Sequence, residues 1–418
     1  MRLPQLLPKW AQVGHFARAT LYRLLENIKV GTLVIYDGEE TLRFGDATDP
    51  GQPQAQVRVH HRDFYGELLA GGSIGAGESY MQGRWTSPDL LGVIRLFAAN
   101  MSVLEAMDNG KNPLQQLALK LVHTLNGNTL RGSRKNISAH YDLGNEFFSL
   151  FLDPTMMYSA GVFPSPQATL EVAAENKLDL ISLQLELQPG DHLLEIGTGW
   201  GGMAIHAAQH YGCRVTTTTI SREQYDHARA RVAEAGLEDR VTVLCEDYRD
   251  LTGSYDKLVS IEMIEAVGHR YYKDYFQRCS SLLKPQGIMV IQAITMTDQR
   301  YHSARGSVDF IQRYIFPGGC LPSIAVLSGH VARDTDMQII NLRDITNHYA
   351  DTLACWRQRF SAQLDAVRDQ GFDEQFVRMW EFYLCYCEGG FRERTIGTVQ
   401  LTFAKPDYRF VGSLPASS

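Results

Sequence analysis

A glycine-rich turn that follows a short apolar run is the strongest chemical signal in the chain. Residues 193–202 have the sequence LLEIGTGWGG, and Glu195 stands just ahead of Gly197 and Gly199. Glycine allows positive φ and lets a ligand approach the backbone closely. A carboxylate ahead of the turn would repel a pyrophosphate but suits a ligand that carries an ammonium and a sulfonium. The motif therefore favours S-adenosylmethionine over a dinucleotide, whose fingerprint is matched only loosely; the alternative is a tight structural turn.

Several other blocks carry a family resemblance. The block at residues 140–148 (HYDLGNEFF), with the following LDP and MYS, resembles the segment ahead of the cofactor turn in cyclopropane-fatty-acyl-phospholipid synthases and their mycolic acid relatives. Residues 261–268, 314–319 and 383–392 resemble further blocks of that family, and the resemblance spans roughly residues 55–405. Residues 75–85 are similar to the branch that acts on phospholipids, because the mycolic branch lacks this N-terminal domain.

The resemblance implies an S-adenosylmethionine-dependent methyltransferase. Such an enzyme alkylates the double bond of an unsaturated acyl chain in membrane phospholipid and, through a carbocation, gives a cyclopropane. We expect the donor to bind at the turn described above. The family's donor contacts, from the methionine end through the turn and the ribose to the adenine, fall on Tyr158, Ser159, Gly197, Gly199, Thr219, Gln224, Asp247 and Tyr248.

The resemblance also implies a bound bicarbonate that acts as the base. Of its family ligands, the glutamate matches Glu265 and the tyrosine matches Tyr349, whereas Ala160 stands at the cysteine position and Gln292 at the histidine position. Glutamine can donate a hydrogen bond but cannot exchange a proton. Bicarbonate and a cyclopropane product therefore stay open, and we hypothesise that an anion is held between Glu265, Tyr349 and Gln292. Cys387 matches the family's C-terminal cysteine and either lines the acyl slot or acts directly.

Three alternatives remain beside this interpretation. The first is a fatty acyl methyltransferase whose product carries a methyl or methylene branch. The second is a methyltransferase of the same fold that acts on a small soluble acceptor. The third is a lipid-binding relative that has lost catalysis, which the residues at 160 and 292 keep open.

The elements that position these residues follow from the pattern after residue 170. Apolar strands and amphipathic helices alternate, with short links, and this alternation predicts a doubly wound parallel sheet of the Rossmann-like methyltransferase type. The expected strands are 192–196, 214–220, 241–245, 257–261 and 288–294, and the expected helices are 171–187, 202–210, 223–235 and 271–283. Such sheets bind ligands beyond the carboxyl ends of their strands.

The first third of the chain predicts a smaller N-terminal α+β domain at residues 1–109. Residues 31–44 contain Asp-Gly between two apolar runs, which indicates a β-hairpin, and the glycine-dense residues 71–80 indicate a turn or a close-packing segment. A basic amphipathic linker is expected at 110–141, as a membrane-surface contact or as a packed linker helix. The methyltransferase domain is expected at 142–405 and a tail at 406–418.

The composition of the chain limits the kinds of partner that it is expected to bind. The chain has 418 residues, 44% of them hydrophobic, and a net charge of −7, which argues against nucleic acid as the main partner. Seven scattered cysteines give neither a disulfide framework nor a zinc spacing, so no metal is expected. No apolar run approaches the length of a membrane span. We expect a cytoplasmic protein that binds peripherally and transiently to the inner face of the cell membrane; the oligomeric state is open, a homodimer included.

Overall fold

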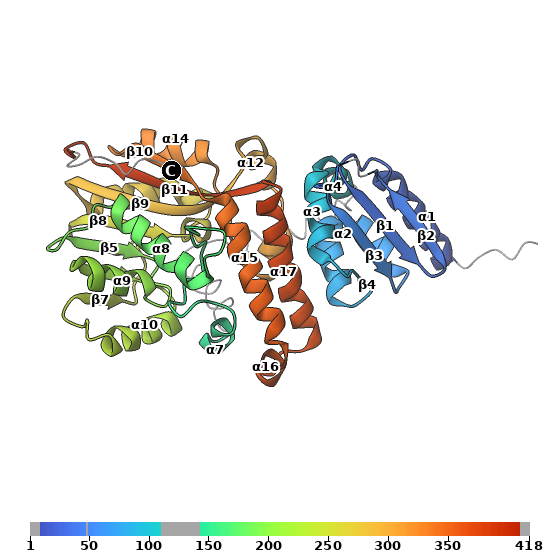
Figure 1. The fold of residues 1–418 in the computed structure, drawn as a ribbon. Coiled ribbons are helices and arrows are strands. Elements are labelled where there is room, and N and C mark those ends of the chain that lie inside the picture. The colour runs from blue at the N-terminus through green and yellow to red at the C-terminus, as the bar shows by residue number, and fades with distance from the viewer. Residues whose placement is uncertain (1–8, 47–48, 110–142, 410–418) are drawn as a thin grey trace, which may run out of the picture. The chain divides into compact units, whose positions relative to one another are not determined.

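The computed structural model describes residues 9–46, 49–109 and 143–409 of the chain (Figure 1). The predicted basic amphipathic linker at 110–141 lies outside these described residues. Two compact units form from segments that are not contiguous. The first comprises Met1–Leu125, Gly306–Pro317 and Ala350–Ile396, and the second comprises Asn126–Arg305, Gly318–Tyr349 and Gly397–Ser418. The predicted methyltransferase range thus contributes residues to both units.

The second unit is built on a seven-stranded sheet in the order β10-β11-β9-β8-β5-β6-β7. Its neighbours β5–β6, β5–β8, β6–β7 and β8–β9 pair in parallel, while β10 and β11 pair antiparallel. This arrangement confirms the predicted doubly wound α/β fold. The strands are β5 (His192–Ile196), β6 (Arg214–Thr218), β7 (Val241–Leu244), β8 (Tyr255–Ile261), β9 (Leu283–Met296), β10 (Gln338–Asp344) and β11 (Ile396–Ala404).

Helices cover both faces of this sheet, and the alternation of side chains along β5 shows it. Successive strand residues point to opposite faces. Leu193 belongs to a core cluster with Met203, whereas Leu194 belongs to a different cluster with Phe276. The helices of the unit are α7 (Asn145–Ser149), α8 (Leu170–Gln184), α9 (Gly202–Tyr211), α10 (Arg222–Glu234), α11 (Tyr272–Leu282), α12 (Asp298–Ala304) and α14 (Ile324–Asp334), with short 3-10 turns at Ile264–Ala266 and His269–Tyr271.

The first unit is an α+β body, as expected. Its four-stranded sheet has the order β2-β1-β3-β4, and the predicted hairpin is present, with Asp37 opposite Glu40. Helix α17 packs against α2 and α3 in this unit. The elements are α1 (Lys9–Leu25), β1 (Thr32–Asp37), β2 (Glu40–Phe44), β3 (Gln54–Val59), α2 (Asp63–Met81), β4 (Trp85–Thr86), α3 (Leu90–Ala99), α4 (Met101–Asn109), α13 (Phe310–Tyr314), α16 (Leu364–Asp369), α17 (Glu374–Arg392) and most of α15 (Thr346–Ala362).

The glycine-dense segment is helical. Residues 71–80 lie within α2, which kinks at Gly72 with φ 55°. Beyond the kink the helix folds close against its own first turns, so that a Cβ on Gly75 would collide with the carbonyl oxygen of Glu67. Close packing, the second of the two expectations for this segment, is therefore the reason for its glycines. Within the described residues, no helix is long and apolar enough to cross a membrane.

Replacing Gly75 with alanine is expected to destabilise the protein. The colliding atom belongs to the backbone and cannot swing away, and overpacking of this kind costs about 1–3 kcal/mol or more. Gly66→Ala, in the same helix, places its Cβ in open space and should be neutral or slightly stabilising, because alanine is the better helix former. Thermal denaturation of both variants checks this expectation; equal melting temperatures would contradict it.

Candidate functional site

The glycine turn joins β5 to α9 at the carboxyl edge of the parallel strands. Gly197 and Gly199 have φ of 102° and 52°, which only glycine adopts without strain. The backbone N–H groups of Gly197 and Thr198 donate to the carbonyl oxygen of Thr218, each at 3.0 Å, and so tie the turn to the end of β6. The turn predicted from the sequence thus has the backbone that a closely approaching ligand requires.

Glu195 is a buried acid on β5, only 2% exposed. Its Oε2 accepts a hydrogen bond from the hydroxyl of Thr217 at 2.6 Å. Burial raises the pKa of Glu195 to about 8, although the Thr217 hydrogen bond and the charge of Lys177 partly oppose this. A carboxyl group held close to its ionisation point in a dry setting gains most from a cationic partner. Glu195 therefore fits a ligand with positive charge, such as the methionine part of S-adenosylmethionine.

Thr219 and Gln224, predicted on the ribose side, lie together. The hydroxyl of Thr219 donates to Oε1 of Gln224 at 2.8 Å, and both residues are buried. Ser221 caps α10 between them by accepting from the backbone N–H of Gln224 at 3.3 Å. Because Thr219 follows β6 and Gln224 lies in the first turn of α10, the strand end and the cap place this pair beside the glycine turn.

Asp247 and Tyr248, predicted beside the adenine, follow β7 at the same edge of the sheet. The carboxylate of Asp247 is bound by Arg249, with Nε at 2.8 Å from Oδ1 and Nη2 at 2.7 Å from Oδ2. The ring of Tyr248 packs edge-on against Tyr275, with the ring centroids 5.4 Å apart. Burial raises the pKa of Tyr248 well above its usual value. Asp247 thus already carries an ion pair, and Tyr248 offers a ring rather than an ionised oxygen.

Tyr158 and Ser159 lie in the segment between α7 and α8. The ring of Tyr158 packs against Phe148, and the Oγ of Ser159 accepts a hydrogen bond from Nζ of Lys177 at 2.8 Å. Lys177 is fully buried on α8. Its pKa falls to about 8 because of burial, which the nearby carboxylates Glu262, Asp153 and Glu195 oppose. Sequence analysis missed Lys177; its signal is a lysine on the face of α8 that otherwise buries apolar residues.

A second acid, the partly buried Glu262, follows β8 directly and was also missed. Its Oε1 accepts from the backbone N–H of Ala160 at 2.9 Å and from Nε2 of Gln292 at 2.7 Å. Its Oε2 accepts from the hydroxyl of Tyr349 at 2.7 Å. Burial raises the pKa of Glu262, which the three hydrogen bonds and Lys177 oppose. The sequence signal was available in hindsight: an acid at the end of a buried strand in the middle of a parallel sheet.

Glu265 lies three residues further, in a 3-10 turn, and has different partners. Its Oε1 accepts from the backbone N–H of Ile294 at 2.5 Å. Its Oε2 is buried, with no hydrogen-bond partner among the residues that the structure describes. Burial and the charge of Glu262 raise its pKa to about 8. We expected Glu265, Tyr349 and Gln292 to hold one anion between them; the structure brings Tyr349 and Gln292 together on Glu262 instead.

Gln292 is oriented by a row of buried amides. Its Oε1 accepts from Nε2 of Gln400 at 3.0 Å, and Oε1 of Gln400 accepts from Nε2 of Gln184 at 2.7 Å. Thr402 donates to Gln184 at 3.2 Å. With its oxygen engaged on this side, the amide N–H group of Gln292 is directed at Glu262. The row therefore fixes Gln292 as a donor at the site.

Cys387 lies on α17, in the first unit. Burial raises the pKa of its thiol far above the usual value, so the thiol stays protonated. Its neighbour Glu388 is 1% exposed and pairs with Arg357 at 2.9 Å and Arg392 at 3.1 Å. These ion pairs account for a buried acid there, and both roles considered for Cys387 stay predictions.

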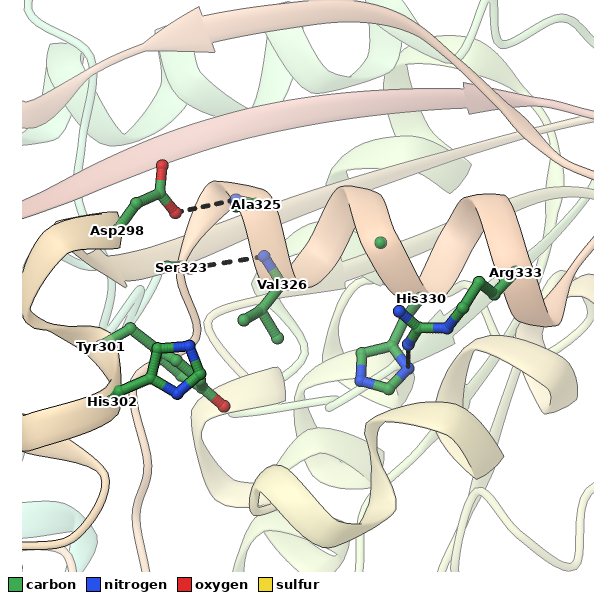
Figure 2. A pocket seen from close by; sticks show the side chains of 9 residues that line it. Asp298, Tyr301, His302, Ser323, Ala325, Val326, His330 and Arg333 are labelled. Atoms are coloured by element: carbon green, nitrogen blue, oxygen red, sulfur yellow. Dashed lines mark hydrogen bonds between the residues drawn. The ribbon is translucent and has the colours of Figure 1, made fainter.

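A cavity between α12 and α14 is also separate from the site (Figure 2). It contains no residue predicted to bind the donor or to act as a base. Its polar groups are engaged locally: Asp298 accepts from the backbone N–H of Ala325 at 2.9 Å, and Nδ1 of His330 contacts Asp334 at 2.8 Å. No role in the predicted reaction follows from this cavity.

Known proteins match this chain over most of its length. A family model described as mycolic acid cyclopropane synthetase matches residues 128–401. The tuberculostearic acid methyltransferase of Mycobacterium tuberculosis is 40% identical over 381 residues, which is 89% of this chain and 87% of that protein. The cyclopropane-fatty-acyl-phospholipid synthase of Escherichia coli K12 is 37% identical over 364 residues, 85% of this chain and 89% of that protein.

Solved structures agree with these sequence matches. The cyclopropane synthase MmaA2 from Mycobacterium tuberculosis is 32% identical with a TM-score of 0.61, covering 65% of this chain and 98% of that one. The mycolic acid cyclopropane synthase CmaA1, solved with S-adenosylhomocysteine, gives the same values. These findings confirm the predicted family resemblance, the Rossmann-like fold and the enzyme class.

Proposed function

We propose that this chain, which belongs to the mycolic acid cyclopropane synthetase family and is an S-adenosylmethionine-dependent methyltransferase, alkylates the double bond of an unsaturated fatty acyl chain in membrane phospholipid. One observation carries the proposal. Two acids, the buried Glu195 and the partly buried Glu262, lie at the carboxyl ends of the neighbouring parallel strands β5 and β8, and the buried cation of Lys177 acts on both. One acid suits a cationic donor and the other suits a departing proton.

The chemistry of an alkene acceptor needs both acids. S-adenosylmethionine supplies an electrophilic methyl group on a positively charged sulfur. An alkene is a weak nucleophile, so the protein must hold the two reactants in line and exclude water. Attack of the alkene on the methyl group leaves a cation on the acyl chain. The reaction is complete only when a base has removed a proton from this cation.

The acyl acceptor is supported by the relatives. The two whole-chain relatives are named for tuberculostearic acid and for fatty acyl phospholipid, and each match extends over more than four fifths of this chain. Their names differ in the reaction, a methyltransferase in one and a cyclopropane synthase in the other. Loss of a proton from the cation on the alkylated chain either closes a ring or leaves an alkene, so both kinds of reaction share the same first step. We place the reaction at the membrane surface, where the acyl chains of the substrate are anchored.

Transfer of a labelled methyl group tests the proposal. Purified protein with labelled S-adenosylmethionine should move the label into the chloroform-extractable lipid of vesicles that carry monounsaturated acyl chains. Each modified chain should gain the mass of one CH2 group; loss of the olefin identifies a ring and its retention identifies a branch. Vesicles with saturated chains are the control and should stay unlabelled. Lipid binding without transfer, or transfer only to a soluble acceptor, would refute the proposal.

A further inference from the structure

We infer that Glu262 is the catalytic base of this chain, a carboxylate supplied by the protein in the place where the resemblance predicted a bound bicarbonate. This inference rests on the proposed function, and it concerns which group occupies the place of the base. Sequence analysis placed an anion between Glu265, Tyr349 and Gln292. Two of these residues, Tyr349 and Gln292, donate to the oxygens of Glu262, and so does the backbone N–H of Ala160 at the family's cysteine position. The side chain thus fills the site that a separate anion would need.

Bicarbonate does not fit beside this carboxylate. The amide of Gln292 donates both to Glu262 and to the carbonyl oxygen of Ala160, the latter at 3.2 Å. The hydroxyl of Tyr349 and the N–H of Ala160 are likewise directed at Glu262. A second anion would find these donors engaged and would stand next to a partly buried carboxylate, which would repel it. The cluster is therefore complete without a separate base.

The backbone of Glu262 supports the same conclusion. Its φ is 48°, a left-handed conformation that is uncommon for residues other than glycine. The strain is held in place by its N–H, which donates to the carbonyl oxygen of Gln292 at 2.7 Å. Glycine would adopt this conformation freely, so what the strained position provides is the side chain. Strained residues of this kind concentrate at functional sites.

The charge around Glu262 is suited to a base. The cation of Lys177 and three hydrogen bonds favour the ionised carboxylate, against the burial that disfavours it. Glu265 lies three residues further along the chain. Burial and the charge of Glu262 raise the pKa of Glu265 and so favour its neutral form. Burial raises the pKa of both acids, and Glu262 is the member whose two oxygens accept from Ala160, Gln292 and Tyr349.

The proposed step balances without a further reactant. The π electrons of the double bond form a C–C bond to the methyl carbon as the C–S bond breaks, and the sulfur leaves as a neutral thioether. The adjacent chain carbon becomes a cation. A C–H bond then breaks, and its electrons either close the ring or restore a double bond. The proton passes to the carboxylate of Glu262 and afterwards to solvent.

Bicarbonate dependence distinguishes a protein carboxylate from a bound anion. In buffer freed of carbon dioxide, the wild-type protein should transfer methyl groups to unsaturated vesicles at an unchanged rate, and added bicarbonate should not raise it. Glu262→Gly should lower the rate about 100-fold or more, the usual worth of a general base. It also opens an anion-sized space between three donors, so added bicarbonate or formate should restore at least a tenth of the lost rate. Glu262→Gln should lose as much and gain nothing, because the amide fills the space.

Glu186→Gly is the matched control. Glu186 has a φ of 51°, so the same substitution is made in the same backbone conformation of the same unit. Its carboxylate accepts from Tyr408 at 2.8 Å, away from the cluster. This variant should keep the wild-type rate and ignore bicarbonate. Calorimetry should show unchanged S-adenosylmethionine binding in all variants.

Three results would overturn the inference: a wild-type rate that falls when bicarbonate is removed, a Glu262→Gly rate near that of the wild type, or a Glu262→Gly variant that binds the donor normally but is not restored by either anion. The first needs no variant, so it stands even if a variant fails to fold. A wild-type protein that transfers no methyl group to unsaturated lipid would instead refute the proposed function. The two failures are therefore distinct.

Discussion

Glu195→Gln is expected to weaken S-adenosylmethionine binding at least about 30-fold when measured by calorimetry above pH 8. Truncating one partner of a buried charge pair costs about 2 kcal/mol or more, and Glu195 is 2% exposed at the start of the glycine turn. Glutamine keeps the size of the side chain and its ability to accept from Thr217. The loss therefore measures the charge of the carboxylate and not its packing.

The pH dependence of donor binding gives a second reading of the same residue. Burial raises the pKa of Glu195 to about 8 in the ligand-free protein, so near neutrality the group is mostly protonated. A cationic donor needs the ionised form, and binding must then release a proton. Donor affinity of the wild type should rise with pH up to about 8 and level off above it.

The Glu195→Gln variant is the control for this pH dependence of donor affinity. Glu195→Gln has no proton to release there, so its weaker affinity should lose this part of the pH dependence. Adenosine, which carries no sulfonium and no ammonium, should bind the two proteins alike. Equal affinity of the wild type and the variant for the charged donor would remove Glu195 from the donor site.

Patterns of adjacent residues predicted the parallel strands of the seven-stranded sheet. The strand expected at 192–196 is β5 with the same bounds, because an apolar run closed by a glycine turn needs no distant contact to be recognised. β10 and β11 were not predicted. Their antiparallel pairing adds an edge to a parallel sheet through contacts between residues far apart in the chain, such as Gln338 and Ala404.

The glycine-dense segment in the first unit shows the opposite case. Glycine is a poor helix former, and its density predicted a turn or a close-packing segment, not a helix. The helix forms because tertiary packing requires small residues: a Cβ on Gly77 would press on the ring of Phe310. Local propensity was overridden by a neighbour more than two hundred residues away in the chain.

The glycine turn was predicted from adjacent residues, whereas Glu262, the base that we propose, was not. The motif drew attention to Glu265, whose surroundings match the family, and away from Glu262. What distinguishes the two acids is their partners: Ala160 and Tyr349 lie 102 and 87 positions from Glu262 in the sequence. No spacing rule reports a contact of that kind. Lys177 was missed for the same reason, since only the fold brings it near three carboxylates.

Lys177→Met is expected to lower methyl transfer at neutral pH more than 100-fold. The charge of Lys177 lowers the pKa of both Glu195 and Glu262. Without it both acids hold their protons to higher pH, so Glu195 pairs poorly with the donor cation and Glu262 cannot accept a proton. Removing one partner from a buried set of charges costs about 3 kcal/mol or more, which matches the expected fold-change.

The direction of the pH shift separates this electrostatic role from simple packing. Plotted against pH, donor affinity and turnover each have a rising limb, the range in which the value increases. The limb of donor affinity follows the pKa of Glu195 and the limb of turnover follows the pKa of Glu262. Both limbs should move to higher pH in Lys177→Met, because the charge of Lys177 lowers both pKa values. Lys257→Met is the control: this lysine is also largely buried, on β8, but its charge acts with Asp191, Glu186 and Asp256. Its variant should keep both limbs in place. If Lys177→Met only lowered the melting temperature and left the limbs unmoved, Lys177 would be a packing residue and the two acids would act independently. Limbs that move together would mean that one buried cation sets the ionisation of the donor site and of the base.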